Sequence, residues 1–479
     1  MTLVRRVAVL VGVVVGGAVP TMACGQARDT VTLADAITEA LERNAAVRQA
    51  RAAVMAADGQ VREAWAQAFP DINASASYQR NFLVQEQIFE FNGEVIRAKF
   101  GFENNWVAGV TISQPLFQAD VFIGVGAASR YRALVREQER GAAQSVVTGV
   151  RQAYLAALAQ LELARLNQSS VDRIRATLEE TRARYRAGLT SEYDVLRFEV
   201  QLANLEPQLR RANDALTAGK RTLLIAMGRS ADEDIDLVGR LADVNVVDLA
   251  QNTPDNARLI ALSGPLLDTL GLDTAYAAAL ATRSDVRQAQ LGITVEEARL
   301  KVERAQLFPK ISLFGSYNLY AQDPGSPSFF GGSGDYRSPA AAGGLRIELP
   351  IFRGFRESAR MQQARASIEQ NRAQLDLARE QTVNDLRTLV AALDETRDRV
   401  ASQGRAVAQA RRGFQIATAE YREGLGSQLQ VTDAELALRE SEYNYALAVY
   451  EHLIARSNLD AALGTVPDAA DVASVGMTN

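Results

Sequence analysis

The chain has 479 residues, a formal net charge of −5, one histidine and one cysteine. An acidic chain gives no support for a nucleic-acid partner, because it has no basic stripe to neutralise phosphates. His452 and Cys24 alone cannot make a zinc site, a Cys/His nucleophile pair or a disulfide framework. The sequence therefore gives no support for a metal site, a bound cofactor or an enzyme of these kinds.

The first 24 residues have the pattern of an export signal. Arg5 and Arg6 precede an apolar run at 7–19, and small residues follow in "PTMACGQA". The run is too short to span a bilayer, which is typical of a signal peptide. Cys24 is a candidate lipidation site, because signal peptidase II leaves a cysteine at the new N-terminus. Ordinary cleavage nearby is the alternative.

The remaining sequence repeats itself once. Residues 46–78 resemble residues 285–317, and the Phe-Pro pairs of the two copies lie 239 residues apart. The phrases "SQPLF" and "ELPIF" follow at similar spacing, as do "ARYRAGLTSEYDVL" and "AEYREGLGSQLQVT". These matching phrases occur in the same order in both halves and at nearly the same separation. They indicate an internal duplication, in which each half carries the same architectural unit.

Together, the export signal and the duplication predict nine segments in chain order. They are the signal peptide 1–24, an N-terminal segment with helices at 25–70, a strand pair at 71–117, a long helical hairpin at 118–228, an acidic, turn-forming region at 229–271, helices at 272–309, a second strand pair at 310–352, a second long hairpin at 353–464, and a tail at 465–479.

Each predicted hairpin begins with a long stretch that favours unbroken helix. Residues 118–187 and 354–423 contain no proline and are rich in Ala, Leu, Arg, Glu and Gln. Small and apolar residues recur at steps of three and four, which is typical of a coiled-coil seam. About 70 residues at ~1.5 Å each would reach roughly 100 Å, far more than a globular domain needs.

After each Phe-Pro pair the hydrophobic period drops to two, which predicts two strand pairs, each joined by a longer loop. Strands of about ten residues with one apolar face fit a membrane-spanning barrel. In support, 19 of the 31 aromatic residues lie within 69–122 or 308–355. A soluble four-stranded sheet with an aromatic core is the alternative. Since four strands cannot close a barrel, the membrane interpretation requires oligomerisation, with eight strands from two chains or twelve from three.

Taken together, these features resemble the outer-membrane efflux protein family, the TolC-like ducts. The resemblance rests on the duplication, the paired Phe-Pro, "QPLF" and "LPIF", the two "YRxGL" phrases and "ARSNLDAALGT" at 455–465. It implies a mainly α-helical fold with a membrane β-barrel, built as a homotrimer with a twelve-stranded barrel in outer-membrane lipid and a long helical barrel in the periplasm. Residues 229–271 and the tail would form the equatorial region.

The same resemblance implies a passive duct of a tripartite efflux or type I secretion system. Such a duct accepts cargo from an inner-membrane pump through a periplasmic adaptor protein and performs no chemistry. A periplasmic coiled-coil scaffold without a pore is the alternative, since it would use the same helices. Adaptors also combine export signals with helical hairpins, but they lack duplicated hairpins flanking two aromatic strand pairs. The nature of the cargo is not encoded in these features.

The two "YRxGL" phrases are predicted to be the turns of the hairpins. Gly188 and Gly424 can adopt the left-handed conformation that ends a helix. Ser191 and Ser427 then serve as N-caps. By resemblance these turns face the adaptor, and the predicted docking residues are Gly188, Leu189, Thr190, Gly424, Leu425 and Gly426.

By the same resemblance, the second turn carries a gate. The family's two aspartates, three residues apart, align with Gln430 and Asp433, so only one carboxylate ring is retained. A frequent gate arginine aligns with Gly426, which puts the family's ionic lock between helices in doubt. The predicted periplasmic gate residues are Tyr421, Gln430, Asp433 and Asp194. For Asp194 a plain helix-capping role is the alternative.

Overall fold

The computed structural model describes residues 29–466, except 92, 100, 247, 249–250, 265–271 and 324–336. The predicted signal peptide with Cys24, the loop of the second strand pair and nearly all of the predicted tail lie outside the described residues.

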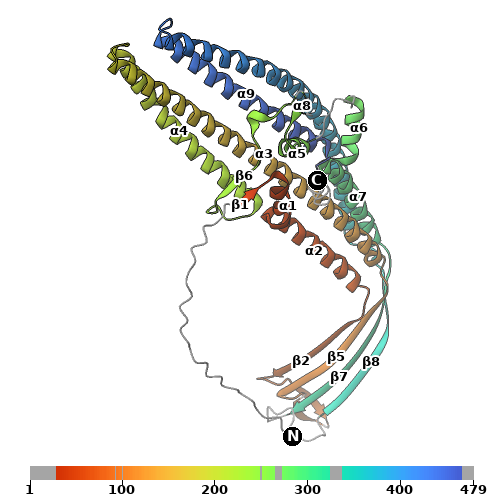
Figure 1. Cartoon of the computed structure of the whole chain (residues 1–479). Helices are drawn as coiled ribbons and strands as arrows, with labels where there is room; N and C mark the ends of the chain where they lie inside the picture. Colours follow the sequence, from red (N-terminus) through yellow and green to blue (C-terminus); the bar gives the residue numbers. More distant parts are fainter. Residues whose placement is uncertain are drawn as a thin grey trace, which may run out of the picture.

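Long helices and one four-stranded sheet dominate the described chain (Figure 1). In order, the elements are β1 (Asp29–Val31), α1 (Leu33–Arg43), α2 (Ala45–Ala66), β2 (Asp71–Arg80), β3 (Glu86–Phe91), β4 (Glu94–Lys99), β5 (Asn104–Phe117), α3 (Ala119–Arg186), α4 (Glu192–Met227), β6 (Ile235–Leu237), the 3-10 helix η1 (Leu241–Asp243), α5 (Pro254–Leu262), α6 (Leu272–Thr282), α7 (Ser284–Ala305), β7 (Lys310–Asp323), β8 (Arg337–Glu348), α8 (Arg356–Arg422) and α9 (Gln428–Leu463).

The two predicted long hairpins are present. Helix α3 packs along α4 and α8 packs along α9, while α9 also lies against α3 and so joins the two halves. Helices α3 and α8 have 68 and 67 residues, confirming the two long helices predicted from composition. In Figure 1 the hairpins extend together away from the sheet, so their turns form the end of the molecule farthest from the strands. No helix among the described residues is long and apolar enough to cross a membrane.

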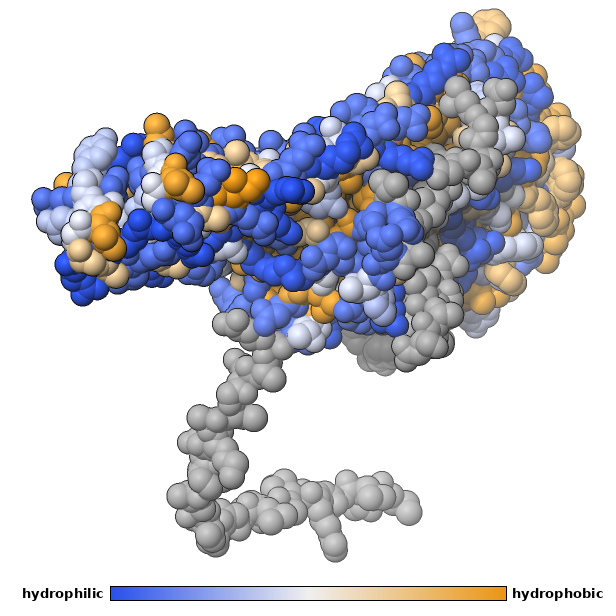
Figure 2. Space-filling view, turned by 45° about the horizontal axis from the view of Figure 1, so that its top comes forward, coloured by the Kyte–Doolittle hydropathy of each residue, from blue (hydrophilic) through white to orange (hydrophobic). Residues whose placement is uncertain are grey.

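The sheet has the order β2-β5-β7-β8 with every neighbouring pair antiparallel. The two predicted strand pairs are confirmed as β2 with β5 and β7 with β8, and the β5–β7 pairing joins the duplicated halves. Large apolar side chains such as Ile72, Leu313 and Ile347 remain exposed on the sheet. Hydrophobic residues gather most densely at the end away from the helical tips (Figure 2).

One prediction for the strand region was incomplete. The segment between β2 and β5 was predicted to be a loop, but it contains the antiparallel pair β3 and β4, with Glu86 opposite Lys99 and Phe91 opposite Glu94. Alternation in "EQIFEF" and "EVIRAK" is short and mixes charges with apolar residues, so it gave a weak strand signal.

The main hydrophobic core lies at mid-length, where α1, α3, α4 and α9 meet the segment that follows α4. The hydroxyl of the fully buried Tyr154 lies 3.0 and 2.8 Å from the carbonyl oxygens of Val31 and Val238, which share its one proton, and so fixes the β1–β6 pair onto α3. Nearby, Arg151 of α3 and Asp460 of α9 form a buried ion pair at 2.5 Å. The hairpins are therefore anchored to the rest of the chain at their roots.

Candidate functional site at the helical tips

The two turns adopt the same backbone conformation. Gly188 and Gly424 have φ values of 70° and 75°, in the left-handed region that glycine occupies without a steric penalty. Each following leucine returns its N–H to the preceding helix, Leu189 to Arg184 O and Leu425 to Glu420 O, both at 2.9 Å. Bonds of this kind satisfy the last carbonyls of a helix. Both predicted helix stops are confirmed.

The second helix of each hairpin, α4 or α9, also begins as predicted. Ser191 and Ser427 are N-caps, and each forms a reciprocal capping box with Asp194 or Gln430, respectively. Partial burial acts to raise the pKa of Asp194, but hydrogen bonds from Thr190 and Ser191 outweigh it and lower that pKa. Asp194 and Gln430 thus both have a helix-capping role.

Tyr421, at the end of α8, is the predicted gate residue that contacts the other hairpin. Its side chain is 7% exposed, whereas that of its repeat counterpart Tyr185 is 44% exposed. The Tyr421 hydroxyl lies 3.4 Å from Thr181 Oγ1 of α3, and its ring meets Phe198 of α4 edge to face, with 6.4 Å between ring centroids. Tyr421 therefore ties the second tip to both helices of the first hairpin.

Arg184 of α3 makes a second link at this level, and it was not among the predicted residues. Its Nη1 donates to the carbonyl oxygens of Tyr421 and Arg422, at 3.0 and 2.8 Å, and its guanidinium lies 5.3 Å from the Tyr421 ring centroid. A cation at the C-terminus of α8 is favoured by the helix dipole and by the unpaired carbonyls there. Arg422 in turn pairs with Glu180 of α3 at 3.2 Å.

Farther from the tips, a buried carboxylate joins the hairpins. Glu435 of α9 is 1% exposed, accepts a hydrogen bond from Ser170 at 2.5 Å and pairs with Arg173 at 3.3 Å. Arg173 also approaches Glu442 of α9, at 3.8 Å. Because a buried charge without a partner is costly, these contacts fix the register of α9 on α3.

The remaining predicted gate residue, Asp433, is exposed on α9 and has no hydrogen bond or ion pair in the described chain. It lies one helical turn beyond Gln430 and is not brought into contact with Tyr421. The space at Gly426 is tight, since a Cβ added there would lie 3.1 Å from Glu420 Cβ. An arginine at this position would require the turn to shift.

The predicted docking residues form the outermost surface of the two turns. Leu189 is 70% exposed and Leu425 is 83% exposed, which leaves one apolar side chain uncovered on each turn. A groove of about 480 Å³ runs beside them between α4 and α9, and Leu196, Val200 and Leu436 are among its lining residues. The tips thus present apolar surface that the fold of this chain does not itself bury.

The links made by Arg184, Thr181 and Glu435 were missed in the sequence. One signal was available, because the aligned repeats place Arg184 opposite Glu420 and so give the two tips different charges within otherwise similar phrases. Packing between hairpins depends on helix rotation, which local patterns do not encode. Within the described part of the chain, no three His, Cys, Asp or Glu side chains converge as metal ligands would.

The model of the family described as "Outer membrane efflux protein" matches residues 36–229 and 275–465 of this chain. These two stretches together cover most of the sequence, and each contains one strand pair and one long hairpin.

Several known proteins are similar along most of their length. The outer membrane efflux protein BepC of Brucella suis is 22% identical over 449 residues, covering 92% of this chain and 88% of its own. The alkaline protease secretion protein AprF of Pseudomonas aeruginosa is 24% identical, covering 76% and 71%.

Solved structures show the same fold. The outer membrane protein VceC of Vibrio cholerae superposes with a TM-score of 0.66 at 20% identity, covering 90% of this chain and 96% of its own. The open MtrE channel of Neisseria gonorrhoeae gives 0.68 at 20% identity, covering 90% and 88%. With its duplicated hairpins, joined strand pairs and matching family model, the chain belongs to the outer membrane efflux protein family.

Proposed function

We propose that three copies of this chain form a channel through the outer membrane that continues into the periplasm as a helical duct. The observation that carries the proposal is the four-stranded sheet, whose edge strands β2 and β8 lack partners within the described chain and whose apolar side chains are exposed. Unpaired strand edges are not tolerated in lipid, so copies must join edge to edge into a closed barrel. Family membership favours three copies and twelve strands.

The duct is proposed to close at its helical tips. Tyr421 and Arg184 hold the end of α8 against α3, and contacts of this kind can be broken to let the second hairpin swing away. Asp433, exposed beyond the second cap, is proposed to form a ring of three carboxylates around the passage. Gln430 and Asp194 support this arrangement by setting the starts of α9 and α4.

The partners are proposed to be a periplasmic adaptor and an inner-membrane pump of an efflux or secretion system. Exposed leucines on both turns support docking at Gly188, Leu189, Thr190, Gly424, Leu425 and Gly426, because an apolar anchor at a rigid turn is typical of a binding surface. BepC and AprF are named for efflux and for secretion, respectively, so both systems are represented among the relatives.

Three measurements test this proposal. Cell fractionation should recover the protein in outer membranes, with detergent needed to extract it, and native mass spectrometry of the extract should give the mass of three chains. In planar bilayers at neutral pH, Asp433→Ala should raise the conductance or weaken the preference for cations, because it removes the proposed ring of negative charge.

One result would count against the channel, and another would count only against Asp433 as a gate residue. Recovery in the soluble periplasm without detergent would favour a scaffold without a pore. If Asp433→Ala left both the conductance and the reversal potential in a salt gradient unchanged, Asp433 would not be part of the gate. Glu440→Ala is a suitable control, since Glu440 lies on the same helix and is exposed at greater distance from the tip.

A further inference from the structure

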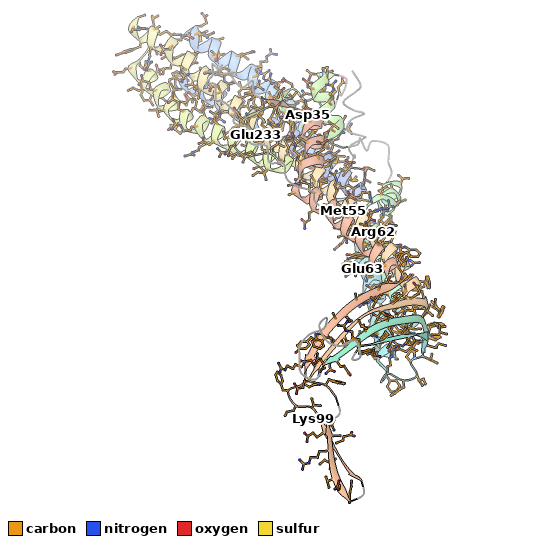
Figure 3. All side chains as sticks on the ribbon, turned by 90° about the horizontal axis from the view of Figure 1, so that it is seen from below. Asp35, Met55, Arg62, Glu63, Lys99 and Glu233 are labelled. Atoms are coloured by element: carbon orange, nitrogen blue, oxygen red, sulfur yellow. The ribbon has the colours of Figure 1, made fainter. Side chains whose placement is uncertain are left out.

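A second feature of interest lies at the opposite end of the molecule, beyond the sheet. Strands β3 and β4 form a two-stranded hairpin, here called the outer arm, defined as residues 86–99. The arm continues the β2–β5 pair, because Asn81 N donates to Glu103 O at 2.7 Å directly beyond the last paired residues of these strands. Figure 3 shows the arm projecting past the sheet, with Lys99 near its base.

Within the described residues, the arm has no third strand paired to it. It is a separate two-stranded sheet, and an isolated hairpin of this size is marginally stable in water. Both of its outer edges carry unpaired backbone groups, which are a template for pairing with another strand. At its base, Phe82 is 89% exposed and Leu83 is 94% exposed, so apolar side chains accompany the free edges. No surface in the described part of the chain covers these edges.

The two edges of the arm carry opposite charge. On one face, β3 has Glu86 and Glu90, whereas β4 has Arg97 and Lys99; the remaining charged residue of β4, Glu94, alternates onto the other face. Glu86 lies directly opposite Lys99 in the register and Glu90 lies opposite Val95, so Glu86, Glu90, Arg97 and Lys99 share one face. They are exposed, and none of the four has an ion pair in the described chain. An acidic edge and a basic edge on one hairpin fit a head-to-tail contact between copies.

Symmetry fixes which residues would meet. In a trimer whose axis runs along the barrel, equivalent residues lie at the same height, so β4 of one arm runs antiparallel to β3 of the next. Lys99 then lies level with Glu86 of the neighbouring copy. Arg97 lies at a height between Glu86 and Glu90 of that copy. Opposite-charge pairs across strands are favourable, and no like charges face each other in this register.

The number of strands determines the diameter at which the three arms can meet. Each arm rises from only two of the four strands that one copy gives to the sheet. Three arms hold half as many strands as the proposed barrel wall, so they can touch only at a smaller diameter. Gly101, with a φ of 126°, lies where the arm returns to β5 and permits the bend that this requires.

We propose that the outer arms of three copies pair edge to edge, β4 of one with β3 of the next, and form a constriction at the outer mouth of the channel. The partner is a second copy of this chain, recognised through the acidic β3 edge and the basic β4 edge. The inference rests on the proposed trimer and adds an interface, outside the barrel, that the trimer alone does not require.

Carbodiimide cross-linking of the purified trimer tests the contact. The reagent joins a carboxylate and an amine as an amide while it takes up the elements of water and becomes a urea. The chain has four lysines, Lys99, Lys220, Lys301 and Lys310, so the products are easily assigned. Covalent dimers and trimers should form on denaturing gels, be lost in Lys99→Arg and persist in the matched control Lys220→Arg.

A charge exchange tests the proposed register. Arg97→Glu with Lys99→Glu should abolish the covalent dimers, and adding Glu86→Lys and Glu90→Lys should restore them by inverting both edges. Absence of covalent dimers in the wild type, products that do not depend on Lys99, or failure of the exchange to restore them would each overturn the inference. Native mass spectrometry separates the two proposals, because an intact trimer without these products refutes only the arm contact, whereas a monomer refutes the channel.

Discussion

At the residue scale, the two duplicated turns at the tips have the same backbone conformation but make different side-chain contacts. The caps and glycine stops follow from local chemistry and were predicted from the sequence. Tyr185 and Tyr421 occupy the same position in the repeat, yet only Tyr421 is buried against the other hairpin. Arg184 adds a second difference, because it donates to carbonyl oxygens at the end of α8, whereas the carboxylate of its counterpart Glu420 has no N–H to donate.

Asp194 gives a pH-dependent prediction at this scale. Its pKa is lowered in the folded tip, so its stabilisation is present above the ordinary carboxyl range and is lost as the pH falls through the lowered pKa. Asp194→Asn should therefore reduce hydrogen-exchange protection at the start of α4 at pH 7, after correction for intrinsic exchange rates. The reduction should shrink in strong acid, where the wild type also loses the charge.

Asp433→Asn serves as the control for this effect, because Asp433 is exposed and caps nothing. Equal loss of protection from Asp194→Asn at neutral and at strongly acidic pH would show that the carboxylate charge does not stabilise the cap.

At the scale of elements, the sequence predicted helices better than strands. Helices α3 and α8 could be predicted from the sequence, because the small helix propensities of about 70 proline-free residues sum to a clear signal. Strand β8 begins with "RSPAAAGG", whose small residues and proline give no alternation, and it is held as a strand only by pairing with β7. The outer arm was missed for a related reason, since short mixed strands depend on a partner that local sequence does not show.

The joint between the hairpins was equally hidden, because Glu435 looks like any charged helix residue in the sequence. Glu435→Ala should lower the thermal unfolding midpoint measured by circular dichroism, with a loss of roughly 2–3 kcal/mol in the free energy of unfolding, because it leaves Ser170 and Arg173 without their buried acceptor. Glu440→Ala on the exposed face of α9 is the matched control and should have almost no effect. Similar midpoints for both variants would show that the Glu435 contacts do not hold α9 on α3.

At the scale of the whole molecule, the two hairpins share the way they are anchored as well as their shape. Gly228 ends α4 and Gly464 ends α9, both in the left-handed conformation. A Cβ would lie 2.8 Å from Arg43 C at the first and 2.7 Å from Arg283 N at the second, so each glycine lets a hairpin end pack on the helix junction of its own half. Rigid roots and linked but uncovered tips are the properties that a duct opened at its inner end requires.

Single-channel recording of Arg184→Ala in planar bilayers tests this account most directly. Loss of Arg184 removes the donors that hold the end of α8, so the account predicts a conductance above that of the wild type. Arg186→Ala, an exposed change at the same turn, should conduct like the wild type. Equal conductance of Arg184→Ala and the wild type, or no channel current from either, would contradict a duct closed by contacts between its helical tips.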